Sequence, residues 1–140
     1  MKPWIASGLL CAALLMTGPV QADERLYEQL GGRPGIELIV DEFLEALSRD
    51  LRVVARFADT NIERFHRMLV EQICELSGGP CEYSGDSMVL VHTGMDISEA
   101  EFNAVVENLM LAMERASLPL SAQNRLLAKL APLRAEIIHR

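Results

Sequence analysis

Basic residues and long apolar runs are both scarce in this chain, and each shortage excludes a class of protein. There are 13 lysines and arginines against 20 aspartates and glutamates, which gives a net charge of −7. An acidic protein repels phosphate backbones, so we expect no nucleic-acid partner. No apolar run reaches the roughly 20 residues that a helix needs to cross a bilayer. The glycine fingerprint of a nicotinamide- or flavin-binding domain is also missing.

Cysteine and histidine are rare as well, which limits metal chemistry. The three histidines, His66, His92 and His139, do not combine with the cysteines at zinc-ligand spacing. Cys74 and Cys81 flank a glycine pair, and an oxidising compartment would allow a disulfide between them. Two separate thiols are an equally good interpretation from the sequence alone.

The N-terminal segment, residues 1–22, has the pattern of a cleaved secretory signal. Lys2 provides a positive start, residues 5–16 an apolar centre, and Val20-Gln21-Ala22 a small-residue cleavage site. The alternative, a membrane anchor, needs a longer apolar run. We therefore expect a periplasmic protein whose mature chain, residues 23–140, is a single domain. Its contact with the membrane is expected only through the signal peptide, before cleavage.

The remaining sequence predicts an all-α domain of six or seven helices, because no stretch shows sustained alternation of apolar and polar residues. The helices are expected at 23–30, from Pro34 to near 50, at 60–76, in a short segment ending at His92, from 98 to before Pro119, and from 121 onward with a kink at Pro132. Expected caps are a Thr60–Glu63 box, Ser84 or Asp86, a Ser98–Glu101 box, and Ser121. The expected apolar face of the 60–76 helix is Ile62, Phe65, Leu69, Ile73 and Leu76.

Residues 77–97 organise the chain, because they place a histidine on an apolar helical face just after a glycine-rich loop. Met88, Val91, His92 and Met95 recur at three- and four-residue steps and so share one face. Such an environment suits a neutral imidazole that offers a nitrogen to a metal. A core histidine with a backbone partner would give the same local pattern.

Motifs on both sides of this segment favour the metal-binding interpretation, because together they resemble those of a known family. LYEQLGG at 26–32, VDEF at 40–43 and GGPCEYSGDSM at 78–88, followed by His92, resemble the group I truncated haemoglobins. The resemblance covers nearly the whole mature chain and implies a two-over-two helical sandwich around a haem. It also implies that His92 is the proximal iron ligand. Because no C-x-x-C-H motif is present, we expect non-covalent haem b.

The distal side departs from the family pattern. Leu44 stands where members usually have tyrosine, and Phe65 and Leu69 where they often have glutamine. Dioxygen held at an iron carries partial negative charge, which a hydroxyl or amide donor stabilises by roughly 0.5–1.5 kcal/mol or more. Without such donors we expect weak retention of dioxygen and relatively better binding of carbon monoxide or nitric oxide. Gln72 or His66 could still turn inward and donate.

Other expected haem contacts rest on the resemblance alone. They are Phe57 at the haem edge, Tyr83 near the propionates, Met88 on the proximal face, and Met68 on the distal helix. Each has an alternative: Phe57 and Met88 as core residues, Tyr83 as an anchor of its own turn, and Met68 as packing. A further alternative is that Met68 binds the iron as a sixth ligand.

Four functions are compatible with this pattern. The first is a globin that reversibly binds a diatomic gas, without being an enzyme. The second is a haem enzyme, a nitric oxide dioxygenase or peroxidase-like protein, which also requires a redox partner. The third is an electron carrier with His92 and Met68 as axial ligands. The fourth is a helical module that has lost haem and serves only in protein contacts.

Overall fold

The structure is a computed structural model that describes residues 20–140. It is helical, and its α-helices span α1 Val20–Gln29, α2 Gly32–Arg49, α3 Ile62–Leu76, α4 Met88–His92, α5 Glu99–Arg115, α6 Leu120–Leu130 and α7 Arg134–Ile137. Two 3₁₀ turns, η1 Val54–Phe57 and η2 Ala131–Leu133, complete the order. The only β pairing among the described residues is an isolated parallel bridge between Ile97 and Ile138. The predicted all-α class is therefore confirmed.

Most of the predicted signal segment lies outside the described residues. The first described helix, α1, begins at Val20 rather than at the expected residue 23. No helix in the described part of the chain is long and apolar enough to cross a membrane.

The helix ends follow local chemistry, although three expected caps are wrong by one to three residues. Asn61, not Thr60, caps α3 by accepting from the Arg64 N–H, and Ser87, not Ser84 or Asp86, caps α4 by accepting from the Leu90 N–H. At α6 the cap position is Pro119 rather than Ser121. The Ser98–Glu101 capping box is present as expected, and the last helix changes to a 3₁₀ turn around Pro132.

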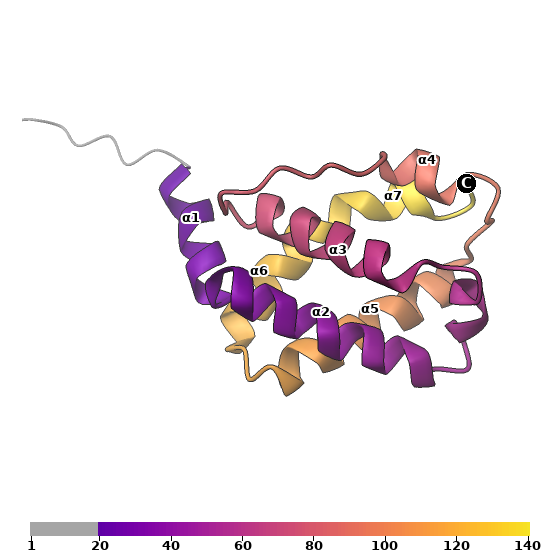
Figure 1. The fold of residues 1–140 in the computed structure, drawn as a ribbon, viewed down its shortest axis with the longest axis horizontal. Coiled ribbons are helices and arrows are strands. Elements are labelled where there is room, and N and C mark those ends of the chain that lie inside the picture. Colours follow the sequence, from indigo (N-terminus) through magenta and orange to yellow (C-terminus); the bar gives the residue numbers. More distant parts are fainter. Residues whose placement is uncertain (1–19) are drawn as a thin grey trace, which may run out of the picture.

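Helix α2 packs on both α5 and α3 and runs along the lower part of the view in Figure 1. Its predicted apolar stripe is buried throughout: Ile36, Ile39, Val40, Phe43 and Leu47. The core continues into α3, α5 and α6 through Val70, Ile73, Cys74, Leu109, Met113 and Leu126. Helix α4 packs on α7 instead, and a long loop from the end of α3 leads to it across the top of the view in Figure 1.

The apolar face of α3 differs from the expected one in an informative way. Ile62 is half exposed, at 50%, and Phe65 and Leu69 are only partly buried. The fully packed stripe of the helix is Val70, Ile73 and Cys74, which faces α2 and the core. Of the stripe predicted from periodicity, Ile73 is therefore buried as expected, whereas Ile62, Phe65, Leu69 and Leu76 remain partly uncovered.

Candidate functional site

The candidate site is built around His92, the last residue of α4. Its Nδ1 lies 2.8 Å from the carbonyl oxygen of Met88, one helical turn earlier. A carbonyl only accepts, so Nδ1 carries the proton and donates it in this hydrogen bond. The other ring nitrogen, Nε2, therefore keeps its lone pair, which is the tautomer that a metal-binding imidazole requires.

One side of α4 turns inward and the other turns to solvent. Met88 and His92 are partly buried, whereas Val89, Leu90 and Val91 are exposed. Among the described residues, no group of three or more His, Cys, Asp or Glu side chains could hold a metal ion. A lone imidazole on an apolar helix face suits a metal whose other ligands belong to a cofactor.

The expected wall residues come from three elements and share one property: they are apolar and incompletely covered. They are Leu44 on α2, Phe57 in η1, and Phe65, Met68 and Leu69 on α3. The rings of Phe57 and Phe65 stack with centroids 5.4 Å apart. Leu44, Phe57, Phe65 and Leu69 pack against the buried core from its edge. Partly covered apolar side chains without a charge among them fit a flat, largely apolar group such as haem, which would cover them.

The two polar candidates on α3 differ in their contacts. His66 Nε2 lies 2.9 Å from Asp41 Oδ1 on α2, so this imidazole is already engaged with a carboxylate. Gln72 is partly buried, and within residues 20–140 its side chain has no hydrogen-bond partner. Its amide is therefore available as a hydrogen-bond donor on α3.

Tyr83 anchors its own turn, which is the alternative considered from the sequence. Its hydroxyl donates to the Asp86 carbonyl at 2.9 Å, and its backbone N–H donates to Glu75 at 3.2 Å. Burial raises the pKa of the Tyr83 phenol. A side chain at Gly85 would have its Cβ 2.3 Å from the Tyr83 hydroxyl, so only glycine fits beneath this ring.

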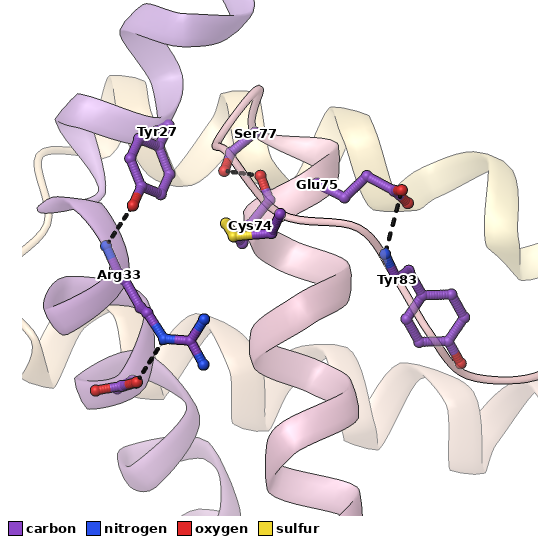
Figure 2. Close-up of a disulfide and its surroundings, with 8 residues drawn as sticks. Tyr27, Arg33, Cys74, Glu75, Ser77 and Tyr83 are labelled. Atoms are coloured by element: carbon purple, nitrogen blue, oxygen red, sulfur yellow. Dashed lines mark hydrogen bonds and ion pairs between the residues drawn. A yellow bond between two sulfur atoms is a disulfide. The ribbon is translucent and has the colours of Figure 1, made fainter.

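The loop between α3 and α4 is tied to α3 by a disulfide between Cys74 and Cys81, which resolves the alternatives left by the sequence (Figure 2). Glu71 on α3 accepts from the Ser84 hydroxyl and N–H at 2.6 and 3.0 Å, and these bonds lower the pKa of Glu71. On the other side of the disulfide, Gly79 leaves room for the Tyr27 ring and for the Cys74 sulfur. The loop that delivers α4 is therefore fixed to the helix that carries the apolar wall.

Sequence reasoning missed the contacts that hold the segment after His92. The Arg56 guanidinium donates to the Met95 carbonyl, and Asp96 pairs with His139 at 2.8 Å. The His139 imidazole is exposed but paired in this way. Arg56 is far from Met95 in the sequence, and Asp96 is far from His139, so no spacing pattern could have indicated these pairs.

This geometry defines a helical protein with an imidazole whose Nε2 is free and with partly covered apolar side chains on α2, η1 and α3, an arrangement compatible with the plan of a globin. Comparison with known proteins agrees. Residues 25–139 match the family model described as bacterial-like globin. A group 1 truncated hemoglobin, GlbN, of Mycolicibacterium paratuberculosis is 31% identical over 112 residues, covering 80% of this chain and 82% of that protein. The chain belongs to the bacterial-like globin family, with group 1 truncated hemoglobins among its relatives.

Solved structures support the same fold. Truncated hemoglobin from Tetrahymena pyriformis, in its Fe(III) form, matches with a TM-score of 0.79 and 25% identity over 82% of this chain and 98% of that one. A 2/2 hemoglobin from Synechococcus with covalently attached heme matches with a TM-score of 0.76 and 23% identity, covering 82% of this chain and 98% of that chain. The predicted two-over-two arrangement is thus confirmed.

Proposed function

We propose that this protein is a haem-binding globin that reversibly binds a diatomic gas, with His92 as the proximal ligand and an apolar distal pocket. The single observation that carries the proposal is the Nδ1–H bond from His92 to Met88, which leaves Nε2 free to bind iron. The partly covered apolar side chains on α2, η1 and α3 support it. Bound haem supplies the iron that coordinates the gas. Residues of this chain hold the imidazole in one tautomer and keep water from the apolar side.

The distal side of the proposed pocket lacks donors at three positions where the resemblance to group I truncated haemoglobins implies tyrosine or glutamine. Solved variants of the Tetrahymena pyriformis protein replace one tyrosine and two glutamines. The intervals between those three positions equal the intervals between Leu44, Phe65 and Leu69. These three side chains offer only apolar contacts, so we propose that the pocket retains dioxygen weakly and binds less polar diatomics relatively better. Gln72, on α3, is a donor that could still turn toward the ligand.

Absorption spectra of the haem-loaded protein in ferric, ferrous and carbonyl forms test this proposal. We expect a five-coordinate ferrous form that takes up carbon monoxide. His92→Gly should lose the proximal histidine and regain a normal spectrum with added imidazole, while His66→Gly, the matched control on α3, should resemble the parent. An unchanged spectrum in His92→Gly would rule out this ligand.

The same spectra separate the other functions. A six-coordinate ferrous form that Met68→Leu converts to five-coordinate would assign Met68 as a ligand and favour an electron carrier. Turnover of nitric oxide by the oxygenated protein would favour a dioxygenase, which also requires a redox partner. We propose neither as the main function, because the wall contains no donor that would retain dioxygen.

We further propose that the haem is b-type and non-covalent, and that the protein is exported to the periplasm by residues 1–22. The Cys74–Cys81 disulfide supports export, because such bonds persist mainly in oxidising compartments. Acidified butanone should extract the haem completely, and a haem that stays with the protein would show covalent attachment. Cell fractionation and N-terminal sequencing should find a mature protein beginning at Asp23; a cytoplasmic, uncleaved chain would contradict export.

A further inference from the structure

Arg56 makes three polar contacts that join two distant parts of the chain. From η1, its Nε and Nη2 donate to the two carboxylate oxygens of Glu101 at 2.7 and 3.0 Å, and its Nη1 donates to the Met95 carbonyl at 3.0 Å. The guanidinium thus binds the Glu101 carboxylate bidentately and also donates to the backbone carbonyl of Met95. Such geometry is more specific than that of an ordinary surface ion pair.

The carbonyl that Arg56 holds lies in the segment directly after His92. The Met95 N–H donates to the His92 carbonyl at 3.1 Å. The residue that Arg56 binds is therefore itself hydrogen-bonded to the backbone of His92. This segment is irregular: Gly94 and Asp96 both have positive φ, at 86° and 46°. Helix α4 has only five residues, so contacts from outside must fix its C-terminal end.

The other end of the Arg56 bridge is firmly placed. Glu101 also accepts from the backbone N–H of Ser98 at 2.9 Å, within the capping box that begins α5. Arg56 is followed directly by Phe57, which stacks on Phe65 of α3. The Arg56 side chain therefore links three parts of the molecule: η1, which also contains Phe57, the start of α5, and the segment that follows His92.

We propose that Arg56 is a positioning residue for His92, which fixes the height and angle of the imidazole by holding the Met95 carbonyl against the start of α5. This inference rests on the proposed function, because a position matters only if His92 binds haem iron. Loss of the bridge leaves the Met88 hydrogen bond and the tautomer intact, but it allows the segment after His92 to move.

Arg52 provides a matched control in the same part of the molecule. It also reaches from the region after α2 to α5, donating to Glu107 at 2.6 Å, and it pairs with Asp50 at 2.7 Å. It contacts nothing in residues 93–97 that the structure records. Arg52→Gln therefore removes a comparable bridge to α5 without touching the segment after His92.

The test compares Arg56→Gln, Arg56→Lys and Arg52→Gln by two measurements. The first is amide hydrogen exchange of residues 93–97 in the haem-free protein. The second is the iron–histidine stretching frequency of the ferrous haem-loaded protein. We expect Arg56→Gln to speed exchange about fivefold, the factor for one typical hydrogen bond, and to shift or broaden the iron–histidine band. Arg56→Lys, which can keep one contact, should be intermediate, and Arg52→Gln should match the parent in both.

The outcomes are separable. If Arg56→Gln leaves the iron–histidine band unchanged, with or without faster exchange, Arg56 has no positioning role and this inference is wrong. If the parent itself shows no iron–histidine band, or keeps it in His92→Gly, the proposed function fails instead. Arg56→Lys preserves the test if Arg56→Gln does not fold.

Discussion

At the scale of single residues, the gas preference of the proposed pocket depends on three side chains that lack a hydrogen-bond donor. Leu44, Phe65 and Leu69 are all partly buried at the edge of the core. An apolar side chain contacts every diatomic ligand in nearly the same way. A donor, in contrast, favours the ligand that gains negative charge when it is bound.

Leu44→Tyr should therefore slow dioxygen dissociation about two- to tenfold, which corresponds to one net hydrogen bond of about 0.5–1.5 kcal/mol. Carbon monoxide dissociation should change much less. The measurement is ligand dissociation by rapid mixing of the haem-loaded protein. Leu38→Tyr, an equivalent change at an exposed position of the same helix, is the control; an equal effect there would show that Leu44 is not in the pocket.

Gly35 carries a residue-scale constraint on the fold. A Cβ at this position would lie 1.9 Å from the Leu30 carbonyl oxygen, which belongs to the backbone and cannot rotate away. Gly35→Ala should lower the free energy of unfolding by about 3–4 kcal/mol. Gly94→Ala places the same methyl in open space, so only its positive φ should cost stability, about 1–2 kcal/mol. Urea denaturation of both variants checks the difference, and equal losses would contradict a steric cause at Gly35.

At the scale of elements, α4 depends on its connections because it is too short to be stable by itself. In the chain before α4, the loop is fixed to α3 by the Cys74–Cys81 disulfide and by Glu71 and Glu75. In the chain after α4, Arg56 donates a hydrogen bond to the Met95 carbonyl. Contacts outside its own helix, on both sides of α4, thus help to place the imidazole.

Reduction of the disulfide should lower the free energy of unfolding by about 2–3 kcal/mol, the loop-closure value for a cross-link between residues seven apart in sequence. Denaturation of the mature protein with and without a thiol reductant measures this loss. The double variant Cys74→Ser/Cys81→Ser should be less stable by a similar amount and insensitive to reductant. A reductant effect that persists in the double variant would assign the loss to something other than this disulfide.

At the scale of the whole molecule, an acidic chain is held together partly by carboxylates whose pKa values are lowered on folding. Hydrogen bonds from Arg56 and from the Ser98 N–H lower the pKa of Glu101 to about 2. Bonds from Arg52 and Asn108 lower the pKa of Asp50 well below its usual range. A carboxylate with a lowered folded-state pKa stabilises the fold above its unfolded pKa, and this contribution disappears as the pH falls toward the folded value.

The free energy of unfolding should therefore fall as the pH drops from about 4.5 to about 2, the window of Glu101. Glu101→Gln should flatten the decline in this window and lower stability at neutral pH. Denaturation midpoints measured across this range provide the test. Glu82→Gln, which removes an exposed loop carboxylate, is the control. An identical decline in Glu101→Gln and the parent would show that this ion pair contributes nothing.

Much of the architecture was predictable because helices are encoded by neighbours three and four residues apart. The buried stripe of α2, the capping box at Ser98 and the break at Pro132 all follow from such local patterns. Caps at Asn61 and Ser87 were missed because several polar residues precede each helix, and only the backbone path decides which one lies at the cap position.

The sequence by itself determined that the chain is all-helical and that Met88 and His92 share a helix face, since both properties depend on short-range periodicity. Only the tertiary structure decided which distant groups meet. It joined Cys74 to Cys81, turned His66 toward Asp41, and brought Arg56 to the Met95 carbonyl. The physical reason is that a contact between remote residues depends on the path of the whole chain, which no local pattern of side chains specifies.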